Sequence, residues 1–111
     1  DVEDIARFAA DFEVDLVGLN CSFGPAPMDG PLRALRGAWR GPLGAWPNAG
    51  VPSLEDGGWA WPVDAECMAA WCSSAARSQG LRIVGGCCGT TTEHVAAIAA
   101  ALAQSGGSTP P

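Results

Sequence analysis

The sequence contains no lysine and no tyrosine, and it is poor in charge of either sign. Its six basic residues are all arginines, twelve acidic residues outnumber them, and the formal net charge at pH 7 is −6. Nucleic acids and anionic membrane surfaces both select basic patches on a protein. We therefore expect no nucleic-acid partner and no membrane partner.

Long apolar runs are also missing. No run reaches the roughly 18 residues that a membrane span needs, and the acidic start Asp1–Asp4 lacks the basic region that opens a signal peptide. We expect a cytoplasmic protein. Because the first residue is aspartate rather than methionine, we also expect a chain that was processed or cut from something longer.

The composition is otherwise that of one modest domain. The chain has 111 residues, of which 48% are hydrophobic, enough for a packed core. Five cysteines are an odd number, and two of them, Cys87 and Cys88, are adjacent. Adjacent cysteines rarely pair with each other, because the peptide between them must distort to close the ring. An intracellular protein that uses thiols for metal binding or chemistry fits better than a secreted disulfide framework.

The most informative stretch is Leu81–His94, around which the chain is organised. Ile83 and Val84 form a short β-branched run that leads into two glycines, the cysteine pair, a third glycine and three threonines. This order predicts a strand, a tight turn and a helix, with both thiols at the C-terminal tip of the strand, where βα folds usually place their chemistry. Thr90 as N-cap with Glu93 three residues later predicts a capping box.

The rest of the chain alternates between helical and strand patterns. Apolar spacing and turn residues predict helices over 2–12, 28–39, 64–79 and 91–104, strands over 13–21, 41–46 and 81–84, loops over 47–52 and 53–63, and a flexible tail over 105–111. Repeated βα units indicate a parallel sheet with right-handed crossovers. Three strands are too few to bury themselves, so we expect a part of a larger α/β fold.

Several packing expectations accompany these elements. Ile5, Phe8, Ala9 and Phe12 should form the face of the first helix that packs on another element, and the strand over 13–21 should be buried on both faces. Three arginines of the second helix (Arg33, Arg36 and Arg40) should form a solvated face. Two further cysteines (Cys67 and Cys72) should be core residues, and the Trp59/Trp61 pair should serve packing.

Cys21 lies at the C-terminal end of the predicted strand over 13–21, just as Cys87 and Cys88 follow the C-terminal end of the predicted strand over 81–84. If these strands are near neighbours in one parallel sheet, the thiols of Cys21, Cys87 and Cys88 converge at one edge. Three thiolates with an open fourth position describe a catalytic zinc site. Asn48, in the loop after the intervening strand, can offer a carbonyl oxygen as a displaceable fourth ligand. Such a site suits thiol activation, since zinc deprotonates a bound thiol while three anionic sulfurs leave the incoming thiolate nucleophilic.

Simpler interpretations stand beside these. The adjacent cysteines can be small buried residues, and Cys21 taken alone is more often structural than a ligand. Asn48 fits a turn residue nearly as well as a ligand. His94, the only histidine, is more consistent with a capping or surface residue than with a catalytic base.

Three motifs resemble those of the homocysteine S-methyltransferase family in order and spacing. They are Gly18-Leu-Asn-Cys-Ser-Phe-Gly-Pro25, Pro47-Asn-Ala-Gly-Val-Pro52 and Gly85-Gly-Cys-Cys-Gly-Thr-Thr-Thr-Glu-His94. Among the family's branches, they are most similar to the homocysteine-binding module of cobalamin-dependent methionine synthases and to the bifunctional bacterial methyltransferase–reductases. The similarity covers nearly the whole chain except the tail.

This resemblance implies a zinc-dependent methyl transfer to homocysteine, giving methionine. By motif position it makes Cys21, Cys87 and Cys88 the zinc ligands and Asn48 the residue that the homocysteine sulfur displaces. It implies a (β/α)8 TIM barrel, with residues 1–104 as its C-terminal portion, about strands 6 to 8, followed by the tail over 105–111. One local departure is Thr92, which stands where the family usually has proline.

The larger departure is that roughly the first five βα units of such a barrel are absent. Those units supply the acidic groups near the substrate's amino group and much of the donor-facing surface in the family, so we expect little or no activity from this chain alone. The methyl donor stays open between methylcobalamin or methylfolate, betaine, S-methylmethionine and S-adenosylmethionine. Two alternatives from other classes are a non-enzymatic zinc or thiol module and a thiol redox protein.

Overall fold

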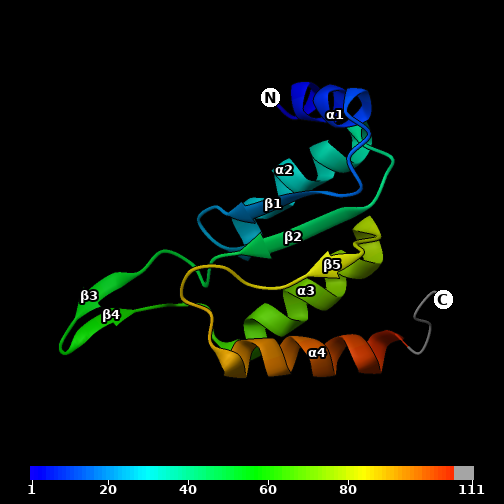
Figure 1. The fold of residues 1–111 in the computed structure, drawn as a ribbon. Coiled ribbons are helices and arrows are strands. Elements are labelled where there is room, and N and C mark those ends of the chain that lie inside the picture. The colour runs from blue at the N-terminus through cyan, green and yellow to red at the C-terminus, as the bar shows by residue number, and fades with distance from the viewer. Residues whose placement is uncertain (107–111) are drawn as a thin grey trace.

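The structure, a computed structural model, describes residues 1–106 and is an α/β arrangement of helices on a small parallel sheet (Figure 1). The helices are α1 (Val2–Asp11), α2 (Pro25–Ala38), α3 (Ala65–Gln79) and α4 (Thr92–Gly106), and the strands of the sheet are β1 (Val17–Cys21), β2 (Leu43–Pro47) and β5 (Ile83–Val84). The chain order of these elements alternates helix and strand as predicted. Within the described residues, no helix has both the length and the apolarity to cross a bilayer.

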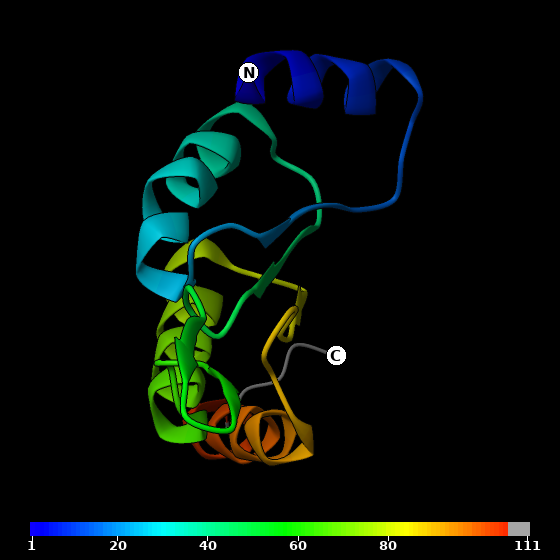
Figure 2. The same cartoon turned by 90° about the vertical axis from the view of Figure 1, so that its left-hand side faces the viewer.

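The sheet confirms the predicted parallel topology. Its strand order is β1-β2-β5, and both pairings are parallel. Cys21 pairs with Pro47, and Gly44 pairs with both Gly18 and Ile83, so the carboxyl ends of the strands lie at one edge. Figures 1 and 2 show α2 and α3 on one face of this sheet, while no described helix lies over the other face.

Strand β1 is shorter and more exposed than predicted. It begins at Val17 rather than residue 13, because a turn follows α1 in which Glu13 adopts a φ of 52°. Burial alternates along it: Val17 is buried against the helices, whereas Gly18 and Asn20 are exposed on the open face. The prediction of burial on both faces was therefore wrong, because helices cover only one side of the sheet.

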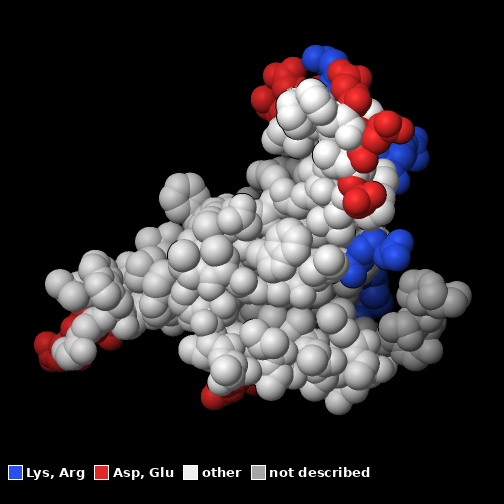
Figure 3. Space-filling view, viewed as in Figure 1, with Lys and Arg blue, Asp and Glu red and all other residues white. Residues whose placement is uncertain are grey.

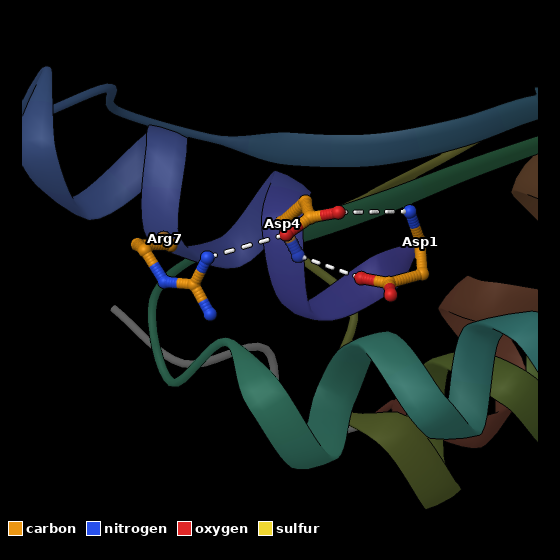
Figure 4. Close-up of polar contacts among 3 residues, drawn as sticks. All are labelled: Asp1, Asp4 and Arg7. Atoms are coloured by element: carbon orange, nitrogen blue, oxygen red, sulfur yellow. Dashed lines mark hydrogen bonds and ion pairs between the residues drawn. The ribbon is translucent and has the colours of Figure 1, made fainter.

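Helix α1 is capped by Asp1, but only Ala9 of the four residues on its predicted packing face is buried. Asp1 accepts a hydrogen bond from the backbone N–H of Asp4, whose side chain in turn accepts from the N-terminal amine and pairs with Arg7 (Figure 4). The buried residues are two alanines (Ala6 and Ala9), and Ile5, Phe8 and Phe12 are exposed. The helix packs on α2 through its small residues, so its aromatic side has no covering element in the described chain.

Helix α2 starts three residues earlier than predicted, because Pro25 occupies its first turn, where a missing N–H costs nothing. Met28, Leu32 and Leu35 are buried. Arg36 corrects the prediction of a purely solvated arginine face. Its guanidinium donates to the backbone carbonyls of Gln79, Trp39 and Gly41 and so joins the ends of α2 and α3.

Helix α3 has the predicted bounds. Asp64 caps its start by accepting from the Cys67 N–H, and Gly80 ends it in a left-handed conformation. Cys72 is a core residue as predicted, and burial raises the pKa of its thiol to about 12. Cys67 is exposed, so the prediction of a core role was wrong for that residue, which lies off the buried stripe of the helix.

Residues 53–63 were predicted to be an irregular loop, but most of them form a hairpin of β3 (Ser53–Glu55) and β4 (Gly58–Ala60). Gly57 and Gly58, both at positive φ, make its turn. The hairpin projects from the molecule at the same end as the carboxyl ends of the sheet strands (Figure 1). Trp59 is 67% exposed, and only Trp61 packs against the core, so the predicted packing role holds for one of the two tryptophans.

Helix α4 starts one residue later than predicted and continues through positions 105 and 106, which were assigned to the tail. The remainder of the predicted tail, 107–111, lies outside the described residues. Two buried clusters form the core: one lies between the sheet, α1 and α2, and the other lies between α3 and α4. Acidic side chains gather over α1 and at the hairpin tip, whereas the face over the sheet shows no charged side chains in this view (Figure 3).

Candidate metal centre

The thiols of Cys21, Cys87 and Cys88 converge at the carboxyl end of the sheet, as the sequence predicted. Their sulfur atoms lie within 4.8 Å of one another, and the Sγ atoms of Cys21 and Cys87 are 3.0 Å apart. Cys21 ends β1, and the pair follows β5, so the cluster joins the two outer strands of the sheet. It is the one group of three or more cysteine, histidine or acidic side chains with such spacing in the described part of the chain.

The end of the central strand β2 holds the two cysteine loops together. The Cys87 N–H donates to the Pro47 carbonyl over 2.8 Å, and the Asn48 N–H donates to the Cys21 carbonyl over 3.0 Å. One residue further on, the Ala49 N–H donates to the Cys88 carbonyl over 2.8 Å. Because main-chain hydrogen bonds on both sides fix these loops, the approach of the thiols does not depend on side-chain contacts alone.

Asn48 bridges the same loops through its side chain. Its Nδ2 donates to the Ser22 carbonyl, and its Oδ1 accepts from the Cys88 N–H, each over 3.0 Å. The amide thus lies beside the thiols and clamps the loops that carry them. An amide oxygen has two lone pairs, so this arrangement leaves one for another partner, and a role as a displaceable fourth ligand stays a prediction.

The backbone at the end of β1 is strained. Cys21 and Ser22 have φ values of 66° and 65°, in the left-handed region that side-chain-bearing residues rarely adopt. Two such residues in succession turn the chain sharply out of the strand. Nothing in the sequence signalled this turn, since neither position is a glycine.

The turn after the cysteine pair is fixed by glycine and threonine. Gly89 has a φ of 82°, and a side chain there would collide with the indole of Trp61 at 2.2 Å. The Thr90 hydroxyl donates to the Cys87 carbonyl over 2.6 Å. Trp61 therefore connects the base of the hairpin to the turn that carries the thiols.

The predicted capping box at the start of α4 is displaced by one residue. Thr91, not Thr90, precedes the helix, and the partner three residues on is His94 rather than Glu93. The Thr91 N–H donates to His94 Nδ1 over 3.2 Å, which leaves the proton on Nε2 to donate to the Val63 carbonyl at 2.8 Å. His94 is buried, and the interpretation as a capping residue is confirmed.

The thiols differ in their ionisation. The hydrogen bond to Cys87, burial and the neighbouring sulfurs raise the pKa of Cys21 to about 11. The same hydrogen bond lowers the pKa of Cys87, because it stabilises the Cys87 thiolate. Cys87 therefore ionises before Cys21, which keeps the proton that the two sulfurs share.

The donor set fits a zinc ion. Zinc–sulfur bonds of about 2.3 Å in a tetrahedron place sulfurs roughly 3.8 Å apart. The three sulfurs already lie within 4.8 Å of one another, with 3.0 Å between those of Cys21 and Cys87, so small shifts suffice to reach that spacing. Thiolates are the soft ligands that favour zinc over magnesium or calcium. A cation would also take the place of the proton that the Cys21 and Cys87 sulfurs share.

A tryptophan on the open face of the sheet lies beside this cluster and was not singled out by its sequence. Added side chains at Gly18, Gly44 and Gly85 would meet atoms of the Trp46 indole at 2.4, 2.7 and 2.9 Å, respectively. The ring therefore lies flat across all three strands on a floor of glycines. The signal available in the sequence was one glycine in or next to each strand.

The chain belongs to the homocysteine S-methyltransferase family, whose model matches residues 1–102. It is 42% identical over 98 residues to a protein named methionine synthase from Mycobacterium leprae and 43% identical over 91 residues to one from Mycobacterium tuberculosis. These alignments cover 88% and 82% of this chain but only 8% of each relative. The resemblance read from the three motifs is thereby confirmed at the level of the family.

Proposed function

We propose that this chain carries the zinc-binding, thiol-activating part of a methyltransferase that converts homocysteine to methionine. The observation that carries the proposal is the convergence of three cysteine sulfurs within 4.8 Å at the carboxyl ends of parallel strands in a member of this family. The family match and the parallel order of β1, β2 and β5 also support placing residues 1–104 at about strands 6 to 8 of a (β/α)8 barrel.

In this proposal Cys21, Cys87 and Cys88 hold the metal, and Asn48 offers its amide oxygen as a fourth ligand that the homocysteine sulfur displaces. Zinc bound there supplies one thing, a lowered pKa for the substrate thiol. The sulfur lone pair then forms a bond to the methyl carbon of the donor, the bond from that carbon to the donor breaks, and its electron pair leaves with the donor. The thiol proton passes to solvent.

The donor is a separate molecule, and methylcobalamin or methylfolate, betaine, S-methylmethionine and S-adenosylmethionine all stay open. The open face of the sheet and the small share of the relatives that the chain spans support a further expectation, that residues outside this segment complete the donor side.

Zinc reconstitution followed by metal analysis tests the proposal. We expect one zinc per chain in the wild type, its loss in Cys87→Ser and its retention in Cys67→Ser, since Cys67 is an exposed thiol outside the cluster. With cobalt in place of zinc, homocysteine should change the visible spectrum. A folded wild-type sample that takes up no metal would contradict the proposal.

A thiol redox function is the second candidate, because the Cys21 and Cys87 sulfurs are already 3.0 Å apart. Oxidation would remove two electrons and two protons from this pair and join the sulfurs, with a disulfide reagent as the oxidant. The position of a third thiol within 4.8 Å favours the metal site instead, since a disulfide needs only two. Mass spectrometry after a disulfide-exchange titration distinguishes them: a reversible Cys21–Cys87 bond that forms in the presence of zinc supports the redox candidate.

A further inference from the structure

Trp46 occupies a prepared place on the open face of the sheet. Its indole crosses three strands, with the six-membered ring over Gly18 and Gly44 and the pyrrole side, including Nε1, next to Gly85. Any side chain at these three positions would lift the ring away from the sheet. A flat tryptophan on three glycines is an apolar platform rather than an interdigitated core residue.

The platform is available to a ligand. Trp46 is only half-buried, although its strand neighbours Ala45 and Pro47 are buried. Within residues 1–106 its indole N–H has no hydrogen-bond partner, and no described side-chain nitrogen or oxygen is both buried and unsatisfied, so this N–H is open to solvent. A tryptophan N–H that is enclosed with a ligand usually finds an acceptor.

The platform also lies beside the thiols. Trp46 pairs with Asn20, the residue before Cys21, and Gly85 precedes Cys87 by two residues. Strands rise about 3.3 Å per residue, so the pyrrole side of the ring, next to Gly85, lies about two residues from Cys87 along the sheet, and the six-membered ring, over Gly18, lies about three residues from Cys21. The N–H is at the end of the indole nearest the cysteine pair.

We propose that Trp46 is the binding residue for the carbon chain and carboxylate of the substrate, a thiol amino acid. This inference rests on the proposed function. The methylene groups of homocysteine lie on the exposed indole face, and the indole N–H donates to the carboxylate. Two methylenes and the α-carbon separate the sulfur from that carboxylate, so one molecule can reach both the thiol cluster and the indole.

The test uses the cobalt-loaded full chain, with homocysteine and aminopropanethiol as probes, because the second compound is homocysteine without its carboxylate. Trp46→Phe keeps an aromatic face but removes the N–H donor. A hydrogen bond to a charged group contributes enough to change affinity by about tenfold or more. We expect that loss for homocysteine in Trp46→Phe, little change for aminopropanethiol, and no change for either probe in Trp59→Phe, a variant of the exposed hairpin tryptophan.

Two results would overturn the proposal for Trp46 while leaving the proposed function intact. One is unchanged homocysteine affinity in Trp46→Phe; the other is an equal loss for both probes, which would show a structural role. The wild type alone gives a further check, because equal affinities for the two probes would rule out a carboxylate contact even if the variant fails to fold. Cobalt uptake without any spectral response to either thiol would refute the proposed function itself, and the proposal for Trp46 with it.

Discussion

At the scale of single residues, the thiol site depends on backbone conformations that the side chains there do not favour. Cys21 has to keep its side chain, but Ser22 only turns the chain and offers its carbonyl to Asn48. Left-handed backbone costs a side-chain-bearing residue about 1–2 kcal/mol, and glycine avoids that cost. A glycine at position 22 should therefore relieve the backbone strain there without changing any of the three cysteines.

We expect Ser22→Gly to raise the free energy of unfolding by about 0.5–1 kcal/mol, after the extra entropy of unfolded glycine is subtracted. Urea denaturation followed by circular dichroism measures this change. The matched control is Ser74→Gly in the middle of α3, which should lower the free energy of unfolding by about 0.5 kcal/mol. A destabilised Ser22→Gly variant would show that the turn is not strained in the folded chain.

Asn48 is the second residue-scale test, because its amide joins both cysteine loops. Asn48→Ala removes the bonds to Ser22 and Cys88, and we expect about a tenfold loss of cobalt affinity at an estimated 0.5–1.5 kcal/mol per bond. Competition with a chelator measures that affinity. Gln104→Ala, on the distant helix α4, should leave it unchanged. Unaltered affinity in Asn48→Ala would mean that main-chain bonds alone hold the loops.

The residues that carry the site were more predictable than their surroundings. Cysteines at the ends of two parallel strands had to meet at one edge, so the positions of Cys21, Cys87 and Cys88 followed from the βα order. The role of Trp46 did not, because a single aromatic residue in a weak strand carries no sign of what lies beneath it. The two left-handed residues were equally hidden, since local chemistry there favours other conformations.

At the scale of elements, helix ends were predicted well where a side chain or a glycine forces them. Helix α3 lies within the predicted range 64–79, since the carboxylate cap of Asp64 and the left-handed Gly80 fix its ends locally. The hairpin over residues 53–60 was missed because its strands are only three residues long and its residues are mostly exposed. The start of α4 shifted because His94 competes with Glu93 for the capping position, a choice set by the distant Val63 carbonyl.

The turn after the cysteine pair gives a prediction for an element. Gly89→Ala places a methyl group both in left-handed backbone and 2.2 Å from the Trp61 indole. We expect the free energy of unfolding to fall by about 2 kcal/mol or more, and metal affinity to fall with it, because overpacking and left-handed strain add. Chemical denaturation and cobalt titration measure the two effects.

The control for this change is another glycine-to-alanine substitution, Gly37→Ala. Gly37 lies in helix α2 with no atom within 4 Å of an added methyl group, so alanine there should raise the free energy of unfolding by about 0.5–1 kcal/mol. Equal effects at the two glycines would show that the contact between the turn and Trp61 is not maintained.

At the scale of the whole molecule, the chain leaves apolar surface without cover. The sheet has helices on one face only, its outer strands β1 and β5 have no further described partner, and Ile83 is 49% exposed on the open face. Phe8 and Phe12 of α1, which stack on each other with ring centroids 4.4 Å apart, are 61% and 68% exposed. Exposed sheet edges and apolar patches of this kind favour association.

We therefore expect the wild-type chain to self-associate as its concentration rises, and we expect the double variant Phe8→Gln/Phe12→Gln to associate less, because glutamine keeps the helix but removes the apolar face. Sedimentation velocity over a range of concentrations measures the change.

Val95→Gln is the control: Val95 is 56% exposed on α4, away from this face, and its substitution should alter association little. If the double variant associates as strongly as the wild type, the aromatic face of α1 is not the contact, and the open edges of the sheet become the surface to block next. If Val95→Gln alone prevents association, the contact lies on α4, and the exposed aromatic pair has no part in it.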